Sequence, residues 1–94
     1  MDAKRIRELL KNKGYNFTRI AKVVGMSPEH VALVANRKRQ NHAIAIAIAT
    51  AVGRPVNVVF PDVPLYHEPY RTDEQREDIL ARELQNRGII RRTA

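Results

Sequence analysis

The chain of 94 residues contains no cysteine, which excludes disulfides and thiolate metal sites and is compatible with a reducing compartment. The start, MDAKRIRELL, has scattered charge and no apolar core, so we expect no signal peptide. The longest apolar run, residues 43–52, is interrupted by Thr50 and has about half the length that a membrane-spanning helix needs. We therefore expect a soluble, cytoplasmic protein without membrane contact.

Residues suited to catalysis or metal binding are few. His30, His42 and His67 stand alone, with no second ligand three or four positions away, so we expect them to face solvent or to form hydrogen bonds. The four glycines are isolated, which excludes a glycine-rich phosphate loop. No Ser-His-Asp or paired-carboxylate arrangement can be read from the remaining candidates. We expect no enzymatic activity, no metal, no cofactor and no small-molecule ligand.

The positive charge is concentrated in the first part of the chain. The net charge is +7, and residues 1–41 hold ten Lys or Arg against three acids, whereas residues 42–94 hold seven of each sign. Such a distribution suits a basic face for a polyanion, but it also suits a solvated surface that keeps a small protein soluble. Charge alone does not separate these two interpretations.

Apolar residues at helical spacing predict three short helices in this basic part. The first covers residues 2–13, and Gly14 follows it as a C-terminal stop. The second begins at Phe17. The third follows Ser27, a capping residue, with Pro28 at its first position. Their inward-facing residues are expected to be Ile6, Leu9 and Leu10; Phe17, Ile20, Ala21 and Val24; and Val31, Val34 and Ala35.

The second and third helices are joined by the tight turn GMS. Gly25 tolerates the left-handed backbone that such a turn needs, and Ala21 is small enough for the helices to approach. Apolar residues expected to lock the crossing are Ile20, Val24, Met26, Val31 and Val34. On these residues, the stretch 17–36 resembles the helix-turn-helix of the Cro and lambda-repressor-like family of DNA-binding proteins.

The resemblance extends to residue 62. Residues 48–53 read IATAVG, similar to the end of the family's fourth helix, and RPVNVVFP follows, with Pro55 apt to start a helix and Pro61 to end it. The aromatic-Pro ending is similar to that of the Ner-like regulators of transposable phages. The resemblance implies an all-α fold, in which residues 1–62 form a five-helix lambda-repressor-like domain, here with an extra C-terminal helix.

The segment HAIAIAIATAV, residues 42–52, has the alternation of a strand but is better interpreted as the fourth helix. Alanine is the strongest helix former, and no partner strand lies nearby. At helical spacing the expected core face is Ile44, Ala47, Ile48, Ala51 and Val52. Ile46 lies opposite that face, so we predict that a second subunit or the C-terminal segment covers it.

The resemblance implies that the third helix, about residues 28–36, lies in the major groove of DNA. The implied base contacts are Ser27, Pro28, Glu29, His30 and Leu33. The implied phosphate contacts are Thr18, Asn36, Arg37, Lys38, Arg39, Gln40 and Asn41. Family members often have Gln or Arg at the base-contacting positions, and this helix has none, so specificity is expected to depend more on DNA shape and phosphates.

The last third of the chain has a different composition. Residues 63–71 are rich in proline and tyrosine and predict an extended connector to a C-terminal helix and basic tail over residues 72–94. A capping box, Thr72 with Gln75, predicts a helix over 73–87 with a narrow apolar stripe. This stripe can pair with a second subunit, pack back on the domain or stay mobile. We favour a dimer, with contacts through Ile46, Ile79, Leu80 and Leu84.

Taken together, these features predict a sequence-specific regulator of transcription that binds double-stranded DNA as a homodimer. A repressor of bacterial or phage origin, acting at the bacterial nucleoid or in the phage-infected host, fits the resemblance best. One alternative is a protein-interaction module of the same fold, such as an antitoxin-like partner. RNA binding is a second alternative, although aromatic stacking residues are missing near the basic segment.

Overall fold

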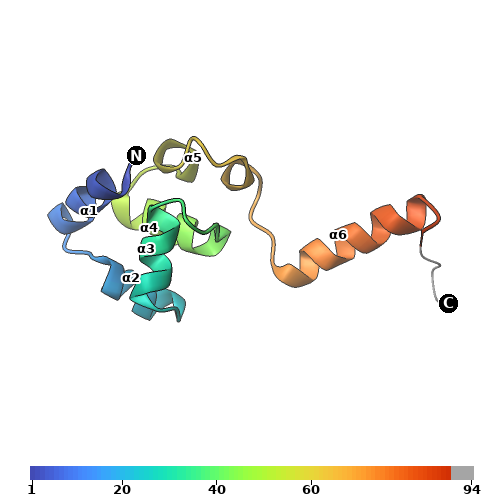
Figure 1. Cartoon of the computed structure of the whole chain (residues 1–94), viewed down its shortest axis with the longest axis horizontal. Coiled ribbons are helices and arrows are strands. Elements are labelled where there is room, and N and C mark those ends of the chain that lie inside the picture. Colours follow the sequence, from blue (N-terminus) through green and yellow to red (C-terminus); the bar gives the residue numbers. More distant parts are fainter. Residues whose placement is uncertain (90–94) are drawn as a thin grey trace.

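The computed structural model describes residues 1–89, and all of its regular secondary structure in that range is helical, with no strand (Figure 1). Its elements are α1 (Ala3–Asn12), α2 (Phe17–Val24), α3 (Pro28–Ala35), α4 (His42–Val52), α5 (Val56–Val59), the 3-10 helix η1 (Pro64–His67) and α6 (Asp73–Asn86). The expected all-α class is confirmed. The part of the predicted basic tail over residues 90–94 lies outside the described residues.

The starts of the longer helices are fixed by local capping. In each case a side-chain oxygen just before the helix accepts a hydrogen bond from a backbone N–H in the first turn, which satisfies a donor that has no partner within the helix. These capping residues are Asp2, Asn16, Ser27, Asn41 and Thr72. The predicted capping box between Thr72 and Gln75 is confirmed, since both of its hydrogen bonds are present.

The segment with strand-like alternation is helical over its whole length, as α4, and lies at the centre of the domain. It packs against α1, α2, α3, α5 and η1. The expected core face is partly wrong, because Ala45 and Ala49 are buried whereas Ala47 and Ala51 are half-buried. A helix with neighbours on several sides buries a sector wider than a single stripe. Ile46 is half-buried.

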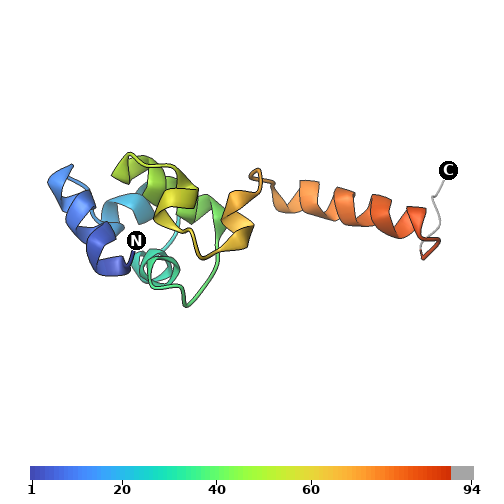
Figure 2. The same cartoon turned by 90° about the horizontal axis from the view of Figure 1, so that it is seen from above.

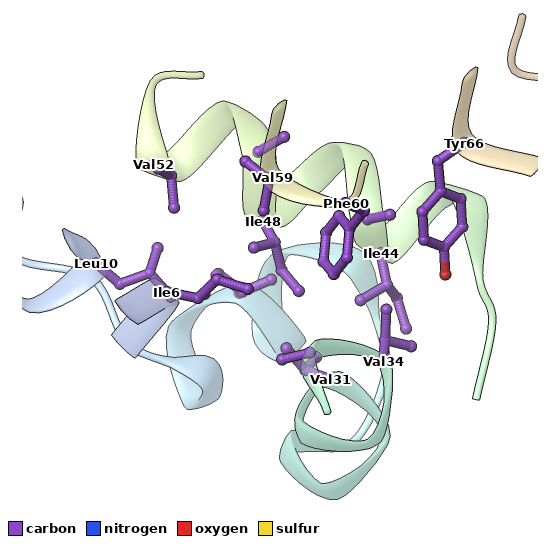
Figure 3. Close-up of a cluster of buried hydrophobic side chains, with 14 of the residues drawn as sticks. Ile6, Leu10, Val31, Val34, Ile44, Ile48, Val52, Val59, Phe60 and Tyr66 are labelled. Atoms are coloured by element: carbon purple, nitrogen blue, oxygen red, sulfur yellow. The ribbon is translucent and has the colours of Figure 1, made fainter. Parts of the chain in front are cut away.

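The core is formed by large apolar side chains that converge from α1, α3, α4 and α5 (Figure 3). It continues beyond residue 62, because Val63 and Tyr66 are also buried. Tyr66 packs edge-on against Phe60, with ring centroids 5.2 Å apart, and its Oη accepts a hydrogen bond from the backbone N–H of Asn41 at 2.9 Å. The extended connector expected over residues 63–71 is therefore wrong at Pro64–His67, where a 3-10 turn directs Tyr66 into the core.

Helix α6 projects from the domain as a separate arm (Figures 1 and 2). None of its residues is buried, and it is absent from the helix pairs that pack closely together. The arm makes the molecule elongated, with extents of 54 × 25 × 21 Å. We predicted that this helix pairs with a second subunit, packs back on its own domain or stays mobile. The structure does not show it packed on its own domain.

Candidate nucleic-acid interface

Helices α2 and α3 form a compact unit held by a left-handed turn. Gly25 has φ +73° and ψ 31°, and its N–H donates to the carbonyl of Ala21 at the end of α2. A Cβ at Gly25 would meet nothing within 4 Å, so the glycine is required by backbone conformation and not by space. Of the residues expected to lock the crossing, Ile20, Val31 and Val34 are buried, whereas Met26 is 39% exposed.

The amino end of α3 is presented to solvent. Ser27, Pro28 and Glu29 are exposed, whereas His30 and Leu33 are half-buried. Ser27 Oγ accepts from the backbone N–H of His30 at 3.2 Å, which fixes the start of the helix. The structure therefore places four of the five predicted base-contacting residues at the amino end of α3 and Leu33 about one turn further along, and it exposes the first three.

The first turn of α2 presents a second group of polar residues. Thr18, Arg19 and Lys22 are exposed along this helix. Asn16 Oδ1 accepts from the N–H of Arg19 at 2.8 Å, while the earlier amides of the turn have no partner within the helix. Such a helix start, next to cationic side chains, favours an anion.

Arg37, a predicted phosphate contact, is engaged by the protein itself. Its Nε and Nη2 donate to the carboxylate of Asp62 at 3.2 and 3.1 Å. Nη1 donates to the carbonyl of Ala35 at 2.9 Å, and Nη2 also donates to that of Val59 at 3.1 Å. The guanidinium lies over the ring of Phe60, 4.7 Å from its centroid. These four bonds use most of the five donors of an arginine, so Arg37 is corrected to a residue that holds the fold.

The same ion pair accounts for the electrostatics of Asp62. The hydrogen bond from Arg37 lowers the pKa of this carboxyl below its ordinary value, with a further contribution from its own backbone. Arg37 also has φ +61°, the one left-handed non-glycine residue among those described. The loop after α3 is thus held to the turn after α5 by both its backbone and its side chain.

The other residues of this loop divide into two groups. Asn36 Nδ2 donates to the carbonyl of Ala32 at 2.8 Å, and Asn41 Oδ1 accepts from the N–H of Ile44 at 3.1 Å, so both side chains complete neighbouring helices. Lys38, Arg39 and Gln40 are exposed. These three are the loop residues best placed to meet a phosphate.

His42 is buried, and the expectation that it faces solvent or forms hydrogen bonds is wrong. It is 5% exposed, and its Nδ1 has no hydrogen-bond partner in the described protein. Its ring lies between Tyr66 and Tyr70, at centroid distances of 5.5 and 5.4 Å. Burial lowers the pKa of His42, and the charge of Arg76 lowers it further. The aromatic neighbours Tyr66 and Tyr70 are more than 20 positions along the chain, so residue spacing could not predict that they bury His42.

Comparisons with protein-family models, with curated proteins and with solved structures found no match for this chain. Across residues 1–89, no helix has the length and apolar character needed to cross a membrane. The same residues contain no group of three or more His, Asp or Glu arranged as metal ligands. The exposed residues of α2, of the start of α3 and of the loop after α3 form the candidate site.

Proposed function

We propose that this chain binds double-stranded DNA through α2 and α3, which act as a lambda-repressor-like helix-turn-helix, and that it regulates transcription as a repressor. The observation that supports this proposal is the solvent-exposed start of α3, held by the left-handed turn at Gly25. The remainder of α3 packs against α1, α2 and α4, so the exposed end is presented on a rigid support. The order of the five helices in residues 1–62 is consistent with the family resemblance.

In this proposal α3 enters the major groove at its amino end. The Glu29 carboxylate accepts a hydrogen bond from a cytosine amino group, and Pro28 contacts a thymine methyl group. His30 and Leu33, which are half-buried, contribute at the edge of the contact. No exposed Arg, Asn or Gln is available at this end for a bidentate base contact, so DNA shape contributes a larger share of the specificity.

Phosphate contacts come from two places in this proposal. Lys38, Arg39 and Gln40 approach the backbone from the loop after α3, and Thr18 does so from the start of α2. Arg37 is excluded from this set because it is bonded to Asp62. Two copies related by a two-fold axis bind two half-sites, separated by about one helical turn of DNA or a multiple of it.

The test begins with selection of bound fragments from random double-stranded DNA and measures affinity for the enriched sequence against salt concentration. Replacing Lys38 and Arg39 with alanine should weaken binding and reduce the slope of log affinity against log salt by about 2 for each subunit, or about 4 for the dimer. The matched control, Lys11→Ala with Arg54→Ala, removes the same charge from exposed positions outside the proposed interface and should bind much as the unchanged chain does. Failure to enrich any sequence, or an unchanged slope in the loop variant, would overturn the proposal, as would tighter binding to single-stranded RNA.

A further inference from the structure

A groove between α2 and α4 has no partner within the molecule. It encloses about 860 Å³ and is lined largely by apolar side chains, among them Val23 and Val24 of α2 and Ala47 and Ala51 of α4. Val23 is 86% exposed, the highest value among the large apolar residues of the described chain. Exposed apolar surface of this kind beside a hollow marks an interaction site.

The arm α6 has an unpartnered apolar face of its own. Leu80 is 55% exposed and Ile79 39%, while Ala81 and Leu84 are half-buried. A helix of 14 residues is marginally stable in water by itself, so packing of this face is needed to stabilise it. The described chain thus contains an apolar groove without an occupant and an apolar helix without a support.

The charges of the groove and of the arm are complementary. The charged residues that line the groove are Arg19 and Lys22, with no acid among them. Helix α6 carries five acids and two arginines, a net charge of −3. A basic rim favours this acidic helix, whereas two copies of α6 paired with each other would bring like charges together.

The arm of one molecule does not lie on that molecule's own groove. Tyr70 packs edge-on against His42, so the chain leaves the domain at the amino end of α4. The groove lies beside the carboxyl half of α4, at Ala47 to Ala51, and α6 points away from α2 (Figures 1 and 2). Docking within one chain would require the arm to reverse its direction and to release Tyr70.

We propose that two copies of this chain exchange arms, with α6 of each copy docked in the groove between α2 and α4 of the other. Leu80 and Leu84 then face Val23, Ala47 and Ala51 of the second copy, with the acids of α6 beside Arg19 and Lys22. Each described chain contributes the groove between α2 and α4 and the arm α6. Reciprocal exchange therefore closes a two-fold dimer in which both grooves are occupied and both arms are packed. This exchange specifies the contact of the homodimer proposed above and does not itself require DNA binding. Thr18, which the proposed function places at a phosphate, also lines this groove, so the docked helix leaves the loop after α3 as the principal phosphate contact.

The test measures the association of the full chain by analytical ultracentrifugation. The unchanged chain should be a dimer. Leu80→Glu with Leu84→Glu in the arm, and Val23→Glu in the groove, should each raise the dimer dissociation constant at least tenfold. Val58→Glu is the matched control, because Val58 is an exposed valine on α5 outside the groove, 47% exposed, and this variant should remain a dimer. Circular dichroism checks that each variant is folded.

Mixing the arm variant with the groove variant gives the sharpest result. In the mixed dimer the intact arm of the groove variant meets the intact groove of the arm variant, so the mixture should associate more tightly than either variant alone. A monomeric unchanged chain, a groove variant that still dimerises, loss of the dimer in Val58→Glu, or no rescue on mixing would each overturn arm exchange. DNA affinity is measured separately, so a dimer that exchanges arms without binding DNA would contradict the proposed function and not this inference.

Discussion

Arg37 and Asp62 form a two-pronged ion pair, in which Nε and Nη2 of the arginine donate to the two carboxylate oxygens at 3.2 and 3.1 Å. The pair joins the loop after α3 to the turn after α5, across 25 positions of sequence. The same guanidinium donates to the carbonyls of Ala35 and Val59. Of three consecutive cations in the sequence, the first therefore stabilises the fold, and the next two remain at the surface.

Replacing Arg37 should affect stability more than replacing its acidic partner. Arg37→Ala removes four hydrogen bonds and should lower the free energy of unfolding by about 2–3 kcal/mol. Asp62→Asn should cost about 0.5–1 kcal/mol, because the Asp62 side chain is 54% exposed and surface ion pairs contribute little. Urea denaturation at neutral pH measures both values, and equal losses would contradict the assignment of the main effect to the carbonyl contacts.

Arg37→Gly separates the contribution of the Arg37 side chain to stability from the cost of its left-handed backbone. Arg37 has φ +61°, a conformation that costs a non-glycine residue about 1 kcal/mol. Arg37→Gly should therefore be more stable than Arg37→Ala, although both lack the guanidinium. If the two variants unfold at the same urea concentration, the left-handed backbone contributes no measurable strain.

The titration of the buried His42 should make the stability of the chain depend on pH. Burial and the charge of Arg76 lower its pKa, with Glu68 opposing them, so the unfolded chain binds the proton at a higher pH than the folded chain. Stability is then fully present above the ordinary pKa of 6.5 and is lost as pH falls from there through the lowered value. His42→Phe keeps a ring between the two tyrosines and does not titrate. The difference in unfolding free energy between the two proteins should move in favour of the Phe variant from pH 7.5 to about pH 5.

The Asp62 carboxyl should produce a second effect at lower pH. Its pKa is lowered by the hydrogen bond from Arg37, so its contribution is present above the ordinary value of 3.8 and is lost as pH falls through the lowered one. Below about pH 4 the unchanged chain should lose stability more steeply than Asp62→Asn. If the unfolding free energies of the two proteins change in parallel with pH, the ion pair does not alter the protonation of Asp62.

The phenol of Tyr66 should support the start of α4. Its Oη accepts from the backbone N–H of Asn41, the residue that caps this helix. Tyr66→Phe keeps the ring but leaves that N–H without a partner, at an expected cost of about 1–2 kcal/mol in unfolding free energy. Hydrogen exchange at the Asn41 amide reports the same loss locally. A variant as stable as the unchanged chain, with equal exchange protection, would contradict this role.

Local chemistry explains which features could be predicted from the sequence. Helix limits, the caps at Ser27 and Thr72 and the left-handed Gly25 depend on residues within a few positions, and the structure confirms them. The role of Arg37 and the burial of His42 depend on residues brought close by folding. Spacing along the chain contains no information about such contacts, so Arg37 was predicted to meet phosphate and His42 to face solvent or to form hydrogen bonds.

The limit of the folded domain can be tested by comparing two fragments. Residues 1–71 keep Tyr66 and Tyr70 and lose only residues 72–94, and no residue of α6 is buried. At concentrations low enough to keep the chain monomeric, this fragment should melt within a few degrees of the full chain. Residues 1–62 lack the ring of Tyr66, and loss of a buried aromatic ring costs about 3–5 kcal/mol.

At about 4–8 °C per kcal/mol for a domain of this size, the shorter fragment should melt more than 12 °C lower or fail to fold. Tyr66→Ala in the full chain is the control, and it should reproduce most of that loss without any truncation. Fragments 1–62 and 1–71 with the same melting temperature would show that the domain ends before η1, and that burial of Tyr66 contributes no net stability.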